Sequence, residues 1–94
     1  MELEKAQREQ AVGPESMIDW EKVDEVTLAL MHLTTFEEHG VIRSWKGYDW
    51  DVLNRLCERG WISNPVNKAK SVVLSEDARM RSEAMFLKYF GRAV

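Results

Sequence analysis

The 94-residue chain is poor in several features, and each shortage excludes a class of protein. Its single cysteine, Cys57, cannot form an internal disulfide, so nothing in the sequence requires an oxidising compartment. No segment approaches the roughly 20 apolar residues that span a bilayer. The charged start, MELEKAQREQ, is not followed by an apolar run, which argues against a secretory signal. These absences predict a cytoplasmic protein without membrane contact.

What is present is typical of a small globular protein. The residues are 45% hydrophobic and 31% charged, which suits a soluble domain, and the length suits one domain rather than two. We predict a flexible arm over residues 1–15, which Gly13-Pro14 interrupts, and one domain over residues 16–94. Four tryptophans in so short a chain indicate a core or an interface built on large rings.

Charge is distributed unevenly along the chain. The net charge is −3, but residues 1–38 carry ten acidic against three basic side chains, a local charge of −7. Residues 43–70 carry six basic against three acidic side chains, a local charge of +3. A negatively charged partner is therefore expected to meet the middle of the chain.

A first helix is predicted over residues 19–38, where apolar residues recur every three or four positions. Gly40 is expected to end it. Leu28 and Met31 fall off the main stripe, and a helix that is apolar on more than one side is usually covered on more than one side. The main stripe, expected to face the core, comprises Val23, Val26, Leu30 and Leu33.

The stretch Ser44–Ala78 organises the rest of the chain. Within this stretch, Asp49 is expected to cap a short helix over residues 50–59, and Gly60 is expected to stop that helix. Residues 41–45 fit either a single edge strand or an extended connector. The inward face of the short helix is expected to comprise Trp50, Leu53, Leu56 and Cys57.

Two short strands are predicted next, over residues 61–63 and 71–74, with a lysine-bearing loop over residues 64–70 between them. Ser75 then caps a last helix that runs to about Phe90. The predicted fold is α+β and mostly α: a long helix, a short helix, a two-stranded β-hairpin wing and a C-terminal helix.

One segment of this chain resembles the recognition-helix and wing segment of bacterial winged-helix regulators. Its pattern is Leu53-x-x-Leu56-x-x-x-Gly60-x-Ile62, then a basic loop, then Val72-x-Leu74-Ser75-Glu76. A narrower similarity is to a family of small bacterial proteins catalogued as a domain of unknown function. It rests on Trp45-Lys46-x-x-Asp49-Trp50-Asp51-x-Leu53-x-Arg55-Leu56 and on Pro65-x-x-Lys68-Ala69-Lys70-Ser71-Val72.

This resemblance covers roughly residues 23–78 and brings no established activity. It implies a winged-helix-like fold, yet one that is reduced. A helix-turn-helix needs a supporting helix before its recognition helix, and only residues 40–48 are available for it here. The docking geometry of such regulators on DNA therefore does not carry over.

One functional interpretation is a DNA-binding transcriptional regulator that uses the wing and the helix over residues 50–59. Asn54 is the best base-contacting candidate, whereas Asp51 and Arg55 are spaced for an ion pair that neutralises the helix face. The alternative for the wing lysines is a solvated loop. The nucleic-acid-binding candidates are Lys46, Asn54, Arg55, Arg59, Lys68 and Lys70.

The alternative interpretation is a protein–protein interaction module that binds no nucleic acid. The apolar surface of the two long helices predicts a homodimer, unless a three-helix monomer wraps that surface from both sides. Trp50 and Trp61 are expected in the core, whereas Trp45 is expected to be partly exposed and to mark a contact surface. The interface candidates are Trp45, Leu28, Met31, Met85, Phe86, Tyr89 and Phe90.

Catalysis and metal binding are not expected. His32, His39 and Cys57 lack the spacing of metal ligands, and each is interpreted as structural. No nucleophile–base pair, glycine-rich phosphate loop or paired-carboxylate motif is evident, and neither is a cofactor or small-molecule ligand site. The sequence predicts a protein that is not an enzyme.

Overall fold

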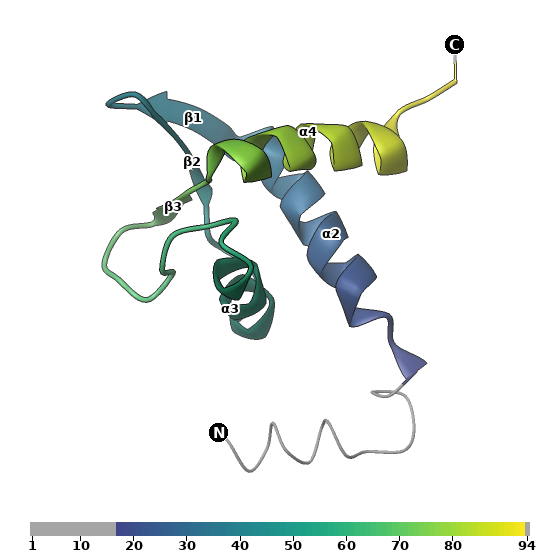
Figure 1. Ribbon diagram of the computed structural model, residues 1–94, viewed down its shortest axis with the longest axis horizontal. Coiled ribbons are helices and arrows are strands. Elements are labelled where there is room, and N and C mark those ends of the chain that lie inside the picture. Colours follow the sequence, from purple (N-terminus) through teal and green to yellow (C-terminus); the bar gives the residue numbers. More distant parts are fainter. Residues whose placement is uncertain (1–16, 94) are drawn as a thin grey trace.

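The computed structural model describes residues 17–93 and combines helices with a three-stranded antiparallel sheet, which confirms the α+β prediction (Figure 1). The predicted arm over residues 1–15 lies outside the described residues. In chain order the elements are α2 (Trp20–Met31), the 3₁₀ turn η2 (His32–Thr34), β1 (Thr35–Glu38), β2 (Val41–Trp45), α3 (Trp50–Glu58), β3 (Ser71–Val73) and α4 (Glu76–Phe90).

Helix α2 begins where the sequence predicts but ends seven residues early. The Asp19 carboxylate caps it by accepting a 3.0 Å hydrogen bond from the amide three residues on. After Met31, the hydroxyls of Thr34 and Thr35 donate to carbonyls one turn back, and the chain leaves the helix for β1. The predicted helix over residues 19–38 is therefore wrong in its last part, where β-branched residues enter a strand.

Strands β1 and β2 form a hairpin around a two-residue turn. Glu38 pairs with Val41, and φ is +53° at His39 and +81° at Gly40, as a type I′ turn requires. Gly40 thus follows a strand and not a helix. The predicted strand over residues 41–45 forms as β2, but its edge position is wrong, because β2 is the middle strand of the order β1-β2-β3.

Helix α3 closely follows its prediction, ending at Glu58. The Asp49 carboxylate accepts a 3.2 Å hydrogen bond from the Val52 amide, and Gly60 adopts a φ of +76° just beyond the helix. Leu53 and Leu56 are fully buried, as expected. The prediction for Trp50 is wrong, because 56% of this residue is exposed.

The wing loop, residues 64–70, connects two segments that pair less than predicted. Ile62 and Leu74 form an isolated bridge, and the Ser63 amide donates a 2.9 Å hydrogen bond to the Val73 carbonyl. Strand β3 instead takes most of its pairing from β2. The helix–wing–helix order of the prediction is retained, but the wing is a loop closed by one bridge.

Helix α4 forms as predicted, from the Ser75 cap to Phe90. The Ser75 hydroxyl accepts a 3.1 Å hydrogen bond from the Ala78 amide. Ala78 and Ser82 are buried, whereas Met80 is 58% exposed. Only one side of this helix therefore belongs to the core.

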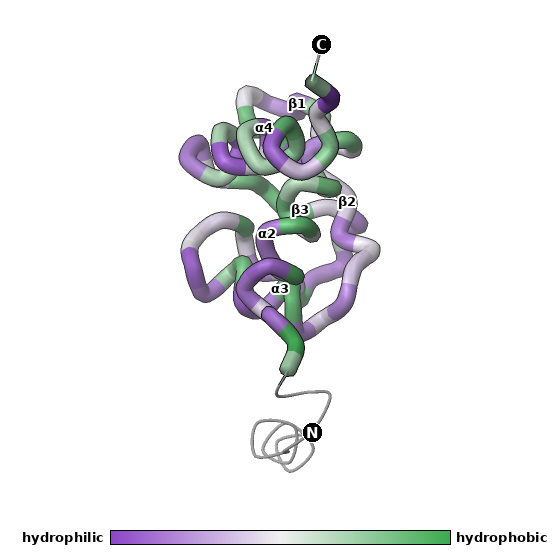
Figure 2. Tube along the Cα trace, turned by 90° about the vertical axis from the view of Figure 1, so that its right-hand side faces the viewer, coloured by the Kyte–Doolittle hydropathy of each residue, from purple (hydrophilic) through white to green (hydrophobic). Residues whose placement is uncertain are grey.

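The core lies where the inner face of the sheet meets α2, α3 and the first turns of α4. Strand β3 lies between α4 and α3 (Figures 1 and 2). The predicted inward stripe is only partly right: Val23 packs against the core, but Leu33 is 64% exposed in η2. Leu28 and Met31, which fall off the stripe, are fully buried. The buried cluster comprises Leu28, Met31, Val52, Leu53, Leu56, Trp61, Ile62, Val72, Leu74 and Ala78.

Candidate interaction surfaces

Arg55 joins α3 to α2. Its Nε donates a 2.7 Å hydrogen bond to one carboxylate oxygen of Asp24, and its Nη2 donates a 2.8 Å bond to the other. Asp24 is 1% exposed, and the guanidinium also lies 5.4 Å from the Trp20 ring centroid. The hydrogen bonds to Asp24 are the main cause that raises the pKa of Arg55, to which Asp51 also contributes through its charge. Arg55 is thus engaged inside the fold rather than offered to DNA.

The outward face of α3 is poorly suited to reading base edges. Asn54, the predicted base-contacting residue, is exposed, but it stands between the exposed Trp50 and Glu58 at four-residue spacing. A carboxylate on this face repels phosphates, and the indole offers one hydrogen-bond donor and no acceptor. Apart from Asn54, this face of α3 offers no polar side chain suited to contacting bases, since Arg55 is bound to Asp24.

Lys46 organises the wing loop. Its Nζ donates to the Pro65 carbonyl at 2.7 Å and to the Asn67 carbonyl at 3.0 Å, with a third contact of 3.1 Å to the Asn67 side chain. The acceptors are neutral oxygens, so these bonds hold the loop without placing a carboxylate against the ammonium group. Its part in the predicted nucleic-acid site is therefore to shape the wing.

The remaining predicted cations reach solvent from the wing and from the end of α3. Lys68, Lys70 and Arg59 are exposed, and within residues 17–93 none of the three forms an ion pair. The Arg59 guanidinium lies 4.9 Å from the Trp61 ring centroid, and that of Arg81 lies 5.3 Å from it. The structure thus keeps the wing lysines free and stacks Arg59 on the core.

A partly exposed apolar stripe runs along α2 and into η2, and we call it the α2 stripe. It comprises Val23, Val26, Leu30 and Leu33, of which the first three are half-buried and the last is exposed. These residues are spaced by three, four and three positions, which is the repeat of a helix that pairs with another helix. The stripe expected in the core is therefore only partly buried: Val23 packs against the core cluster, whereas Leu33 is open to solvent.

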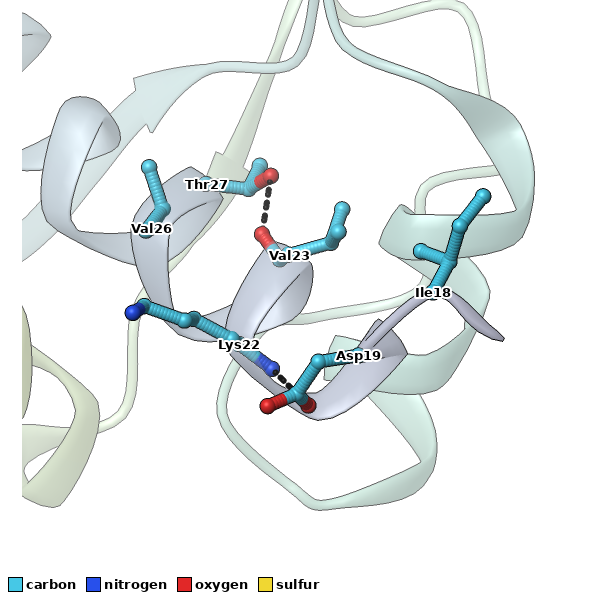
Figure 3. Close-up of a pocket in the computed structure, with 6 residues that line it drawn as sticks. All are labelled: Ile18, Asp19, Lys22, Val23, Val26 and Thr27. Carbon is cyan, nitrogen blue, oxygen red and sulfur yellow. Dashed lines mark hydrogen bonds between the residues drawn. The ribbon is translucent and has the colours of Figure 1, made fainter. Parts of the chain in front are cut away.

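A hollow of about 360 Å³ opens at the first turns of the α2 stripe (Figure 3). The Thr27 hydroxyl donates a 2.8 Å hydrogen bond to the Val23 carbonyl, so its polar group is already satisfied within the helix. Asp19 and Lys22 are the charged lining residues, and the others apart from Thr27 are aliphatic. The lining residues are Ile18, Asp19, Lys22, Val23, Val26 and Thr27.

A second exposed stripe runs along α4, and we call it the α4 stripe. It comprises Met80, Ala84 and Leu87, spaced by four and three positions; Met80 is 58% and Leu87 61% exposed. Phe90, one of the predicted interface residues, flanks it and is 47% exposed. The α4 stripe thus has the same kind of repeat as the α2 stripe.

Aromatic contacts join the two helices near these stripes. The ring of His32, just before Leu33, lies 5.4 Å from that of Phe86, which lies 5.4 Å from that of Phe90. The Tyr89 hydroxyl donates a 2.8 Å hydrogen bond to Glu25 on α2, and this bond raises the pKa of Tyr89. These contacts hold α4 against α2 and η2.

The predicted interface residues separate into two groups. The prediction is wrong for Leu28 and Met31, because both are fully buried within their own chain and are not available to a partner. Met85, Phe86 and Tyr89 are half-buried between the helices. Trp45 is 50% exposed, which confirms its predicted exposure.

Sequence reasoning missed the partial exposure of the α2 stripe. It also missed the ion pair between the buried Asp24 and Arg55. The three-four-three spacing was present, but spacing alone does not say whether a core or a second helix covers a stripe. Asp24 gave no signal, because a charged residue is assigned to the surface unless its partner is known. That partner lies 31 positions further along the chain.

The described part of the chain holds no group of three or more histidine, cysteine, aspartate or glutamate residues placed to bind a metal. His39 occupies the hairpin turn, and Cys57 is half-buried. Among residues 17–93, no helix is long and apolar enough to cross a membrane.

Residues 19–92 match a family described as a domain of unknown function, DUF6429. The chain belongs to this family. The DUF6429 match spans every described element, from the cap of α2 to the end of α4. The chain is also 47% identical over 75 residues to an uncharacterised protein, y4hR, of Sinorhizobium fredii, covering 80% of this chain and 97% of that protein. No solved structure matches the chain. The predicted relation to small bacterial proteins of unknown function is confirmed.

Proposed function

We propose that this protein is a non-enzymatic interaction module that forms a homodimer through the α2 and α4 stripes. The observation that carries the proposal is the exposure of Leu33, Met80 and Leu87, each between 58% and 64% exposed in the single chain. Monomeric soluble proteins rarely leave large contiguous apolar patches in water, and such patches commonly mark protein contacts.

The heptad-like spacing of both stripes favours a helical partner, and the α4 stripe is suited to a second copy of itself. Ala84 is small and lies between Met80 and Leu87, so two α4 helices can approach closely at its position. In an antiparallel pair related by a two-fold axis, Met80 of each copy meets Leu87 of the other.

The charges beside the α4 stripe agree with that arrangement. Asp77 and Lys88 lie on the same edge of α4, three turns apart, and both are exposed. An antiparallel pair places Asp77 of each copy near Lys88 of the other. Opposite charges therefore lie near each other at both ends of the contact, whereas a parallel two-fold pair would set the two Asp77–Lys88 edges on opposite sides of it.

The test is to place charges in the α4 stripe. Met80→Glu together with Leu87→Glu is expected to give a monomer in sedimentation velocity, because four carboxylates would then be buried in the contact. Both positions are exposed in the single chain. The melting temperature of the double variant should therefore stay close to that of the unmodified protein at a concentration low enough to keep it monomeric. Val66→Glu, a change at a 69% exposed apolar residue of the wing loop, is the matched control and should leave the dimer intact. An unchanged dimer in the double variant would refute the proposal.

A second candidate function is duplex DNA binding through the wing loop, supported by one observation. Lys68 and Lys70 are exposed and form no ion pair within residues 17–93, so their charge is free to meet phosphates. The outward face of α3 adds only Asn54. Such binding would depend on the phosphate backbone more than on sequence.

Changing Lys68 and Lys70 to alanine is expected to weaken retardation of duplex DNA at about 50 mM salt and to lower the salt slope by about two units. The melting temperature should not change. The matched control is Lys22→Ala with Arg92→Ala, which removes two exposed cations that lie outside both the wing loop and the proposed α4 contact. DNA binding that responds equally to both pairs of changes would reject the wing as its site.

A further inference from the structure

The outer face of the sheet, turned away from the helices, carries an aromatic pair. Strand pairing sets Phe36 opposite Arg43, and Arg43 opposite Val73. Directly opposed residues share one face, and so do residues two apart along a strand, which adds Trp45 to this set. The ring centroids of Phe36 and Trp45 lie 6.2 Å apart. We call Phe36, Arg43, Trp45 and Val73 the sheet platform.

The sheet platform is open, whereas the opposite face of the same strands is closed. Ser44 and Val72, which point to the inner face, are fully buried. Trp45 is 50% exposed, and Phe36 and Val73 are half-buried and lie outside the core cluster. One exposed and one half-buried aromatic ring thus lie on the outer face of the sheet, at low cost in side-chain entropy for a partner that stacks on them.

Arg43 is held on this platform with donors to spare. Its Nε donates a 2.8 Å hydrogen bond to the Ser71 hydroxyl, and its Nη2 donates a 3.1 Å bond to the Ser71 carbonyl. A guanidinium has five N–H donors, so these two bonds leave others for a ligand. No described carboxylate forms an ion pair with it. Arg43 therefore offers an oriented, uncompensated charge beside the rings.

The platform continues into the wing loop. Trp45 pairs with Ser71, and the next amide, that of Lys46, donates a 3.2 Å hydrogen bond to the Lys70 carbonyl. Lys46, Lys68 and Lys70 thus lie just beyond the end of the sheet that carries Trp45, although alternation turns Lys46 and Lys70 away from the face of the ring. The acidic residue that alternation assigns to the outer face, Glu38, lies at the opposite, hairpin end. Arg43 is therefore the cation of the outer face itself, and an anionic ligand bound there meets the wing lysines only where it passes the end of the sheet.

We propose that the sheet platform binds single-stranded nucleic acid, with bases stacked on Trp45 and Phe36 and a backbone phosphate bound to Arg43. Rings on a sheet can stack only on bases that are not already stacked in a duplex, so the ligand is a single strand. The wing lysines extend the contact along its backbone. This site is separate from the α2 and α4 stripes and shares only the wing lysines with the second candidate function.

The experiment measures the anisotropy of a labelled oligothymidine strand at about 50 mM salt, with the duplex of the same sequence as competitor. Trp45→Ala is expected to weaken binding of the single strand about tenfold or more, from the loss of one stacking contact. Trp45→Phe retains a ring and should retain most of the affinity. Trp50→Ala is the matched control, since Trp50 is also about half exposed but lies on α3.

The outcomes separate the proposals. Single-strand binding that is lost in Trp45→Ala and kept in Trp50→Ala supports the sheet platform. Tighter binding of the duplex, or equal losses in both variants, overturns the platform while leaving the wing candidate to its own test. No binding of either form overturns the platform and the wing candidate together, and leaves the homodimer untouched.

Discussion

Replacing Arg55 by alanine is expected to destabilise the fold by about 3–5 kcal/mol, because the change leaves the carboxylate of Asp24 buried without its partner. Asp24 is 1% exposed and receives two hydrogen bonds from this one guanidinium. The loss should appear as a lower midpoint in chemical denaturation followed by circular dichroism. It should exceed the loss for any other arginine of the described residues, since Arg79 and Arg81 form their ion pairs at the surface.

The control is a cycle that removes both charges. Asp24→Leu combined with Arg55→Met is expected to recover most of the stability, because apolar groups of similar size can replace a buried ion pair at little cost. Arg81→Met, which breaks an exposed pair, should cost less than about 1 kcal/mol. A small loss for Arg55→Ala alone would show that Asp24 reaches water or another donor, and that the clamp between α2 and α3 does not hold the helices.

Replacing Leu53 or Leu56 by alanine is expected to cost about 2–5 kcal/mol each. Both leucines are fully buried in the cluster that joins α3 to the sheet and to α4. The truncation loses buried apolar surface and leaves a cavity that a short helix with few neighbours cannot close. The measurement is again the free energy of unfolding in denaturant.

Trp50→Ala is the informative contrast, because it removes a larger side chain from the same helix. With 56% of Trp50 exposed, the change should cost about 1 kcal/mol, less than Leu53→Ala, because only part of the ring buries apolar surface. If Trp50→Ala proved as costly as Leu53→Ala, the face of α3 assigned here to solvent would belong to the core.

Local signals predicted α3 and α4 well. The caps at Asp49 and Ser75 form the hydrogen bonds that their residue types suggest, and Leu53 and Leu56 face inward as their spacing indicates. These features depend on neighbours within one helical turn. Such interactions can be read from a short window of sequence.

The errors came from interactions between distant residues. The segment after Met31 has apolar residues at helical spacing, yet it becomes β1 because β2 pairs with it and the turn at His39-Gly40 brings the strands together. Likewise, the buried side of α2 was hidden by Asp24, which is acceptable in the core only because Arg55 binds it. Neither partner could be assigned from a single sequence.

The same distinction between local signals and interactions of distant residues applies to the candidate surfaces. The exposure of Lys68 and Lys70 was predictable from a polar loop, and the exposure of Trp45 was predicted although this residue ends a strand and does not lie in a connector. The sheet platform was not, because the neighbours of Trp45 are set by strand register, and one residue of slip would turn Trp45 to the other face.

The most direct test of the central claim, that the α2 and α4 stripes are covered by a second copy, is the mass of the unmodified protein in solution. Sedimentation equilibrium over a range of concentrations is predicted to show a reversible approach to twice the chain mass of 11.0 kDa. A constant mass of one chain at the highest concentration reached would contradict it, and would leave Leu33, Met80 and Leu87 as exposed residues without the role proposed here.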